Sequence, residues 1–354
     1  MQRQCQQCHT ERNAPPTPFW YGTIPYHRIA SMLTSIAPTR NRGLRGLRSL
    51  RPLLSAIVHL SYSVSAALSF APTPSFSNDG QRYLHIISES PINPPLLIIP
   101  GTAQSTELWE QHLPFFTKSR SVLICEPVGV GKQVPRNVDM SIPSQAEILY
   151  QTLQSLNDCE IDTAYDVAGF SLGGRIALAL ACLHSEKVNR LHLTGVALRR
   201  SSWGSLQIAA WKDLLATSGD SLRPFAWSAL LASYSPDFLK AQKDKLPLWI
   251  DGLCQCHTVH GLRELVHQTH DEDNTEWSVQ AMAERLPGRI AGRLCVGRGD
   301  QLSPPSQVEA LAKVLRWPKP SIFSRAGHVP PIETPREWRR DLEDFLDKSR
   351  NEEP

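Results

Sequence analysis

The sequence predicts an α/β fold in which a doubly wound, mostly parallel sheet carries an inserted helical cap. Short apolar runs alternate with amphipathic stretches from residue 82 to residue 196, a pattern typical of parallel sheets covered by helices. The alternation stops over residues 197–288, where the pattern is mostly helical, and then resumes to the C-terminus. We therefore expect a leader with a linker at 1–80, core segments at 81–196 and 289–354, and a cap at 197–288.

The first core segment is predicted to alternate strictly between strand and helix. The run Leu-Leu-Ile-Ile inside residues 95–100 is apolar without interruption, which indicates a strand buried on both faces. Apolar residues recur at helical spacing over residues 105–118. The other expected elements are strands at 82–88, 121–125, 164–170 and 188–196, and helices at 144–156 and from the serine motif described below to residue 184.

The cap is rich in tryptophan, and the second core segment repeats the alternation. Trp203, Trp211, Trp227 and Trp249 lie in the cap, and Trp277 lies near its end. Such residues are most often core, but they also fit a mainly apolar substrate pocket. After the cap we expect strands at 289–296 and 321–324, and helices at 306–314 and 335–348.

The formal charge of +3 is unevenly distributed. Residues 1–70 contain eight arginines, no lysine and one acid, Glu11, so the rest of the chain is slightly acidic. A slightly acidic domain lacks the excess of positive charge that binds the phosphates of nucleic acid. We therefore expect a small-molecule substrate and no nucleic-acid partner.

The leader has the composition of a targeting segment. Five arginines between Arg40 and Arg51 precede an apolar run, 52–68, that ends in small residues. The stretch around Phe70 resembles the cleavage motif of plastid presequences in algae with complex plastids, and a mitochondrial presequence is the alternative. The run is shorter than the roughly 20 residues that a membrane span needs, so no stable anchor is expected in the mature protein.

Neither a disulfide framework nor a cofactor is predicted. Eight cysteines in a chain of 354 residues are too few for a disulfide scaffold. The Cys5-x-x-Cys8-His9 spacing of haem attachment lies in the leader. Four histidines of the cap lie near Cys254 and Cys256, but their spacing matches no zinc signature and favours a polar helix face. These histidines are His257, His260, His267 and His270.

The sequence Gly-Phe-Ser-Leu-Gly at residues 169–173 has the spacing of a serine on a strained strand-to-helix turn. Small residues are required two positions before and after the serine, because the backbone closes tightly against the neighbouring strand and helix. An apolar strand-like run precedes the motif, and a stretch with the composition of a buried helix follows it. Ser171 is therefore the predicted nucleophile, and the Leu172 amide, at a helix N-terminus, is a predicted oxyanion donor.

An activated serine needs a base and an orienting acid. Asp300 follows a predicted strand on a tight turn, and His328 follows the last predicted strand behind a glycine. The alternative acid position, residues 194–212, contains no Asp or Glu. We predict that Asp300 orients His328 and that His328 deprotonates Ser171; the competing interpretations are a helix-capping acid and an ordinary loop histidine.

The chain order serine, aspartate, histidine resembles that of the α/β-hydrolase superfamily, and the resemblance extends over residues 82–348. It implies a second oxyanion donor, the Thr102 amide, in the loop after the buried strand. Pro100 replaces the histidine usual in that loop, which leaves the turn at Gly101 intact but removes a common brace. The segment from Glu126 to Gly131 resembles the family's Asp-x-x-Gly-x-Gly turn and does not fit a phosphate loop.

Arg175 is the residue most able to narrow the substrate. It lies one helical turn beyond Ser171, where an arginine in an apolar helix needs a carboxylate from the protein or from a substrate. The motif from Gly169 to Arg175 resembles that of the menaquinone-pathway lyase that forms SHCHC, in which this arginine holds a substrate carboxylate. Pairing with a neighbouring acid of the protein is the other interpretation. Gly101 and Phe170 are further predicted substrate contacts.

Together these patterns predict a serine hydrolase that attacks a carboxylic ester or similar acyl substrate without metal or organic cofactor. Two alternatives stay open. The same three side chains could serve a lyase with Arg175 as carboxylate clamp, or the fold could serve a binding protein with little turnover.

Overall fold

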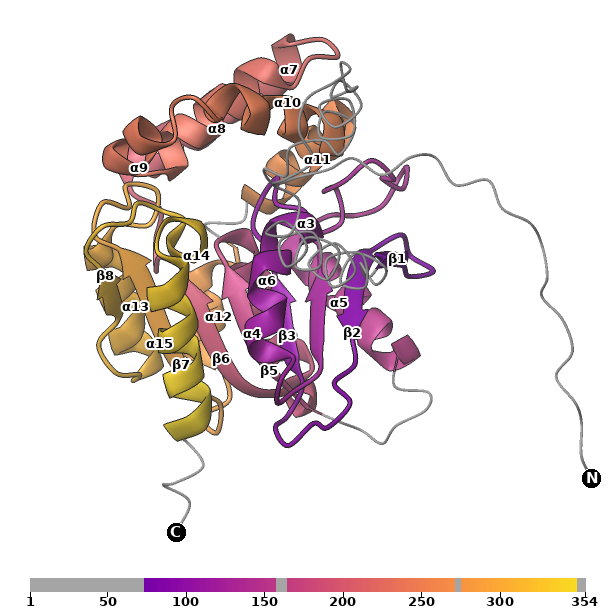
Figure 1. Ribbon diagram of the computed structural model, residues 1–354, viewed down its shortest axis with the longest axis vertical. Coiled ribbons are helices and arrows are strands. Elements are labelled where there is room, and N and C mark those ends of the chain that lie inside the picture. The colour runs from indigo at the N-terminus through magenta and orange to yellow at the C-terminus, as the bar shows by residue number, and fades with distance from the viewer. Residues whose placement is uncertain (1–72, 157–163, 271–274, 349–354) are drawn as a thin grey trace, which may run out of the picture. The chain divides into compact units, whose positions relative to one another are not determined.

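The computed structural model describes residues 73–156, 164–270 and 275–348 (Figure 1). Most of the predicted leader, including its cleavage motif and the haem-like spacing, lies outside these residues. Within them, none of the helices combines the length and the apolar character that crossing a membrane requires.

A single eight-stranded sheet forms the centre of the described chain. Its strand order is β1-β2-β4-β3-β5-β6-β7-β8. From β4 to β8 every neighbouring pair is parallel, whereas β1 and β2 are antiparallel additions at one edge, so the predicted mostly parallel sheet is confirmed. The strands are β1 (Ser75–Phe76), β2 (Arg82–Ile86), β3 (Leu96–Ile99), β4 (Val122–Cys125), β5 (Tyr165–Phe170), β6 (Val188–Thr194), β7 (Ala291–Gly297) and β8 (Ser321–Phe323).

Helices cover both faces of the sheet, and each strand contributes apolar side chains to both. Successive side chains of a strand point to opposite faces. In β3, Leu97 and Ile99 enter one apolar core, and Leu96 and Ile98 enter the other. The first core lies under α5 (Ile142–Leu156), α6 (Leu172–Leu183), α12 (Val279–Arg285) and α13 (Pro305–Leu315); the second lies under α3 (Thr106–Trp109), α4 (Leu113–Phe116) and α15 (Pro335–Lys348).

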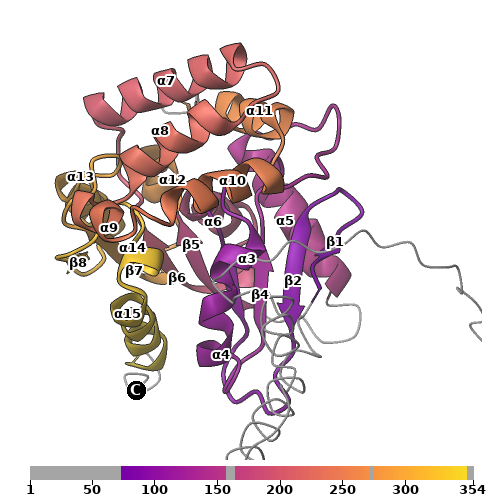
Figure 2. The same cartoon turned by 45° about the horizontal axis from the view of Figure 1, so that its top comes forward.

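The cap consists of helices inserted between β6 and β7, and Figure 2 shows them gathered on one side of the sheet. The cap helices are α7 (Ser202–Thr217), α8 (Arg223–Ser233), α9 (Pro236–Ala241), α10 (Leu246–Cys256) and α11 (Val259–His270). The predicted cap boundary at residue 288 is too late. The last helix before β7, α12, packs on α6 and α13 and so belongs to the core layer (Figure 1).

Two local expectations were wrong, and one short helix was not foreseen. Residues 75–76 of the expected linker pair with β2 as a short edge strand. The single helix expected at 105–118 is divided into α3, a 3₁₀ turn (Glu110–His112) and α4, because Pro114 fits only the first turn of a new helix. A short helix that was not expected, α14 (Pro330–Glu333), follows His328.

Candidate active site

Ser171 lies on a strained turn between β5 and α6. Its φ of 51° and ψ of −115° place a non-glycine residue in left-handed backbone space, which costs on the order of 1–3 kcal/mol and is common at active sites. Its amide donates to the Thr194 carbonyl at 2.9 Å. A Cβ on Gly169 would lie 2.6 Å from the Gly174 Cα, and one on Gly173 would lie 2.0 Å from the Ile99 oxygen. The two small residues are therefore required by backbone contacts.

The structure brings Ser171, His328 and Asp300 into one hydrogen-bonded chain. His328 Nε2 is 2.9 Å from the Ser171 hydroxyl, and His328 Nδ1 is 2.7 Å from the Asp300 carboxylate. Because an ionised carboxylate only accepts, its partner Nδ1 carries the proton, and Nε2 is then free to accept from the hydroxyl. Asp300 and His328 are buried, whereas Ser171 is half-buried and remains accessible. This arrangement can deprotonate the serine.

Further contacts hold the histidine and the aspartate in place. Gly195, at φ +65°, leaves room for the imidazole, because a Cβ there would lie 2.9 Å from His328 Cε1. The carboxylate of Glu333 accepts from the amides of Gly327 and Val329, on either side of His328, at 2.9 and 3.2 Å. The second oxygen of Asp300 accepts from the Ser303 amide at 2.8 Å.

The loop at residues 100–105, which we call the oxyanion loop, packs closely against the first residues of α6. A Cβ on Gly173 would lie 2.4 Å from the Pro100 oxygen, so backbone atoms of the two segments are nearly in contact. Leu172 is the first residue of α6, so its amide has no intrahelical acceptor. No hydrogen-bond acceptor for the Leu172 or Thr102 amide is found among the described residues. In this loop Pro100 stands where the family usually has a histidine, and Gln104 supports the backbone instead. Its side-chain oxygen accepts from the Gly101 amide at 3.1 Å. The two amides remain predicted donors.

Phe170 packs beneath the site. It is buried, and its ring centroid lies 5.2 Å from that of His328 and 6.0 Å from that of Trp109. A Cβ on Gly101 would approach its ring to 2.8 Å. Phe170 therefore packs against both Gly101 and the His328 ring and helps to hold them in position. Contact of Phe170 and Gly101 with a substrate stays a prediction.

Arg175 points from α6 to the end of cap helix α11. Its Nη1 donates to the Thr269 carbonyl at 2.7 Å. Nδ1 of His270 lies 3.4 Å from this Nη1 and 3.0 Å from a guanidinium nitrogen of Arg200. Burial, together with the charges of Arg200, Arg175 and Lys212, holds the pKa of His270 well below its usual range, so the imidazole is neutral and accepts. The role of Arg175 toward a substrate carboxylate stays a prediction.

The four cap histidines do not form one polar face. His260 and His267 are exposed, as expected, but His257 is buried with 4% of its surface accessible. Its Nδ1 accepts from the Gly131 amide at 3.0 Å. The expected polar face was therefore wrong for His257, and the sequence patterns did not single out Gln104 or Glu333. Of these, only Gln104 had a local signal, because it is a hydrogen-bonding side chain three residues beyond Gly101 in a loop where Pro100 replaces the usual histidine.

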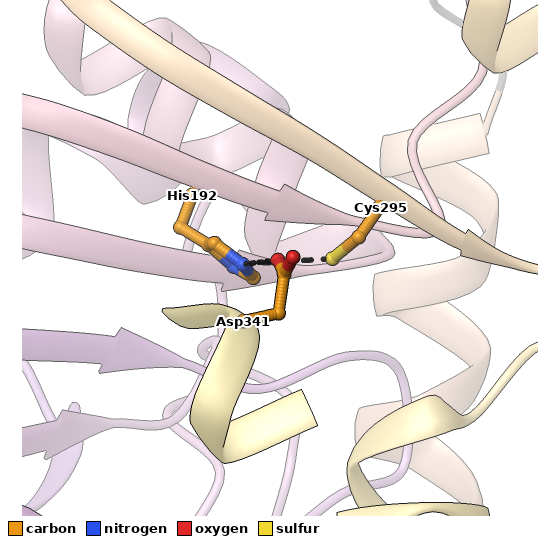
Figure 3. Close-up of side chains that lie close together, drawn as sticks. All are labelled: His192, Cys295 and Asp341. Carbon is orange, nitrogen blue, oxygen red and sulfur yellow. Dashed lines mark hydrogen bonds and ion pairs between the residues drawn. The ribbon is translucent and has the colours of Figure 1, made fainter. Parts of the chain in front are cut away.

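A second polar cluster lies on the α15 side of the sheet, and its three side chains converge in Figure 3. His192 Nε2 is 3.0 Å from the Asp341 carboxylate and 3.6 Å from the Cys295 sulfur. Such residues could ligate a metal ion. However, the other oxygen of Asp341 already accepts from Ser321 at 2.6 Å and from Arg293 at 3.2 Å. We interpret the cluster as a hydrogen-bond network that joins α15 to the sheet.

This network predicts an acid-sensitive contribution to stability. Although burial acts to raise it, the pKa of Asp341 is lowered by hydrogen bonds from His192 and Ser321. A depressed pKa stabilises the fold above the unfolded value, near 4, and this stabilisation is lost as pH falls through the folded value. We expect Asp341→Asn to lower the free energy of unfolding by about 2 kcal/mol at pH 7.

Urea denaturation between pH 7 and pH 3 would measure this effect. The difference between Asp341→Asn and the wild type should shrink toward pH 3, and Asp344→Asn on the exposed side of α15 should change little. A difference that is the same at all pH values would show that the carboxylate charge does not contribute.

Comparisons with known proteins agree with this fold. A family model described as alpha/beta hydrolase fold matches residues 94–225. A pyrrolizixenacetamide deacetylase of Xenorhabdus hominickii is 26% identical over 258 residues, covering 72% of this chain and 91% of the relative. A 2-hydroxymuconate semialdehyde hydrolase of Pseudomonas sp. (strain CF600) is 26% identical over 276 residues, covering 71% and 86%. The solved enol-lactonase of Burkholderia xenovorans LB400 superposes with a TM-score of 0.64 at 17% identity, covering 77% and 99%.

Proposed function

We propose that this chain, which has the alpha/beta hydrolase fold, is a serine hydrolase that cleaves a carboxylic ester or similar acyl substrate through an acyl-enzyme. The observation that carries the proposal is the chain of two hydrogen bonds, 2.9 and 2.7 Å long, from Ser171 through His328 to Asp300. The relatives named above are a deacetylase and a hydrolase, which supports hydrolysis as the reaction class.

In the first half-reaction, the Ser171 oxygen attacks the substrate carbonyl while its proton passes to His328 Nε2. Asp300 stabilises the resulting imidazolium through Nδ1–H. The Leu172 and Thr102 amides stabilise the oxyanion, and the leaving alcohol departs with the proton from His328. In the second half-reaction, His328 deprotonates a water molecule that attacks the acyl carbon, and Ser171 recovers its proton when it departs.

Arg175 has a structural contact that does not depend on a substrate carboxylate. Its Nη1 is hydrogen-bonded to the Thr269 carbonyl of the cap, a contact in which the arginine supports α11. We propose that Arg175 ties the cap to the core close to Ser171, and that the substrate carries a mainly apolar acyl or alcohol portion under the tryptophan-rich cap.

A series of aryl esters tests this function in the full-length protein. We expect hydrolysis well above the rate of Ser171→Ala, with kcat/KM rising as the acyl chain lengthens, because the added methylene groups are buried. Added methanol should divide each acyl group between ester and acid in a ratio that does not depend on the aryl leaving group. A ratio that changes with the leaving group would exclude a common acyl-enzyme.

A further inference from the structure

The backbone around His328 is held by segments outside its own loop, residues 324–329, which we call the histidine loop. Glu333 Oε1 accepts from the amides of Gly327 and Val329 at 2.9 and 3.2 Å. The amide between them, that of His328, donates to the Ser233 carbonyl at 2.7 Å. The carboxylate belongs to α14, and the carbonyl belongs to the end of cap helix α8. The position of the histidine backbone therefore depends on two other segments, one of which is in the cap.

Glu333 also bonds the cap directly. Its second oxygen, Oε2, accepts from the Ser235 amide at 2.8 Å. Ser235 is the N-cap of α9, so it ends the short segment that joins α8 to α9, residues 233–235, which we call the cap link. A carboxylate only accepts hydrogen bonds, and its two oxygens offer about four acceptor sites. One side chain can therefore receive two amides of the histidine loop and one of the cap link at the same time.

The histidine loop and the cap link are in close backbone contact. A Cβ on Gly327 would lie 2.7 Å from the Ser235 nitrogen and 2.9 Å from the Ser233 oxygen. Only glycine therefore leaves room for the cap link at this position. In both ribbon views α14, which carries Glu333, lies between cap helix α9 and core helix α15 (Figure 1, Figure 2).

The other backbone bonds of the histidine loop fix its two ends. Toward β8, the Ala326 amide donates to the Phe323 carbonyl at 3.3 Å, and the Ala326 carbonyl accepts from the Gly299 amide at 3.0 Å. Toward α14, the Val329 carbonyl accepts from the Glu333 amide at 2.9 Å. Among the described residues, the one partner found for the His328 amide is the carbonyl of the cap link.

The contacts of the His328 ring orient it but do not place its backbone. Nδ1 is 2.7 Å from the Asp300 carboxylate, and the ring packs against that of Phe170. The imidazole is rigid, so a shift of the His328 Cα is carried through to Nε2. Because Nε2 is 2.9 Å from the Ser171 hydroxyl, a displaced histidine loop would lengthen the bond through which the serine loses its proton.

We propose that Glu333 is a positioning residue through which the cap link sets the distance between His328 and Ser171. This inference rests on the proposed function and adds that the cap supports the catalytic base as well as covering the substrate. A cap link displaced from Glu333 would take its carbonyl away from the His328 amide and leave the middle of the histidine loop without support. Ser171 and the predicted oxyanion donors lie on other segments and would stay in place.

Two substitutions of Glu333 separate its contacts. Glu333→Gln keeps one acceptor oxygen, and the orientation that keeps most bonds directs this oxygen to the two amides of the histidine loop. Its NH₂ group then faces the Ser235 amide, so this variant loses only the bond to the cap link. Glu333→Met has a similar length and removes every acceptor. The control is Glu337→Gln, which removes a carboxylate that pairs with the exposed Arg325 on the next helix.

We expect kcat for a short neutral ester to fall about 10- to 100-fold in Glu333→Met, because misplacing a catalytic group by about 1 Å can cost about 10²-fold. In Glu333→Gln it should fall by at least about threefold, and Glu337→Gln should match the wild type. KM should stay within about threefold, since the ground state of a short ester does not use His328 Nε2. A purely structural role would instead reduce the amount of folded protein and leave kcat per folded molecule unchanged.

Two kinetic outcomes would overturn the proposal. Wild-type kcat in both Glu333 variants would show that the carboxylate does not position His328. Wild-type kcat in Glu333→Gln with a loss in Glu333→Met would show that Glu333 holds the histidine loop without help from the cap link.

Amide hydrogen exchange tests the same link without turnover. Peptides covering residues 325–331 and 233–238 should exchange faster in Glu333→Gln than in the wild type, while those from β5 and β6 stay protected. Unchanged exchange of the histidine loop in this variant would show that the cap link does not support it. A wild-type protein without hydrolytic activity would contradict the proposed function alone, because the exchange result does not depend on turnover.

Gly327→Ala approaches the same contact from the other side and decides the question if Glu333→Met does not fold. Its methyl group would lie 2.7 Å from the Ser235 nitrogen, so it forces the cap link away while the Glu333 carboxylate is intact. We expect the same faster exchange of the histidine loop and a similar fall in kcat. A Gly327→Ala protein with the exchange and the kcat of the wild type would overturn the proposal.

Discussion

Replacing Ser171 with alanine is expected to lower kcat for ester hydrolysis by about 10⁴- to 10⁶-fold, since the nucleophile and its base act as a unit. Alanine keeps the Cβ, so the strained backbone at φ 51° meets the same steric conditions as in the wild type. The fold and its thermal stability should therefore change little. The loss would then belong to the hydroxyl that lies 2.9 Å from His328 Nε2.

Steady-state kinetics and a thermal melt, performed on the same preparations, would measure this prediction. The matched control is Ser205→Ala, which removes an exposed hydroxyl from cap helix α7. If the Ser171→Ala protein melts like the wild type and keeps more than about 1% of its kcat, another group is the nucleophile.

The second large effect is expected at Gly173, where a single added methyl group should damage both stability and catalysis. A Cβ there would lie 2.0 Å from the Ile99 oxygen and 2.4 Å from the Pro100 oxygen. These are backbone atoms of β3 and of the oxyanion loop, which cannot rotate away. We expect Gly173→Ala to cost about 3 kcal/mol or more in the free energy of unfolding, and kcat of the folded fraction to fall because the oxyanion loop is displaced.

Destabilisation by Gly173→Ala would be opposite in sign to the usual effect of this substitution in a helix. In the interior of a helix, Gly→Ala is normally stabilising by roughly 1 kcal/mol. Gly288→Ala, where no atom lies within 4 Å of the new Cβ, should change stability by less than about 0.5 kcal/mol. Urea denaturation of both variants would measure the contrast. Equal stability of the Gly173→Ala protein and the wild type would show that α6 does not abut the loop.

The parts of the fold that could be predicted are those fixed by local pattern. The uninterrupted apolar run at 96–99 is buried on both faces because each face has its own helical layer. The glycines around Ser171 predicted the turn because only small residues allow that closure. Chain order then predicted where Asp300 and His328 would meet it.

The contacts that surround the site, and the assignment of helices to the core or the cap, could not be predicted, because they join residues far apart in the sequence. The contact between His257 and Gly131 joins residues 126 positions apart, and nothing in the local sequence distinguishes His257 from its exposed neighbour His260. The assignment of α12 to the core depends on its packing against α6 and α13, which helical periodicity alone does not reveal. Pro114 is the exception, since its effect is local and could have predicted the break between α3 and α4.

The most direct test of the central claim is to treat the full-length protein with a fluorophosphonate and to locate the adduct by peptide mass spectrometry. We expect one phosphonyl group per chain, attached to Ser171, with labelling slowed strongly in His328→Ala because the hydroxyl then lacks its base. Folded protein that is not labelled, or that carries the phosphonyl group on another residue, would show that Ser171 is not the nucleophile.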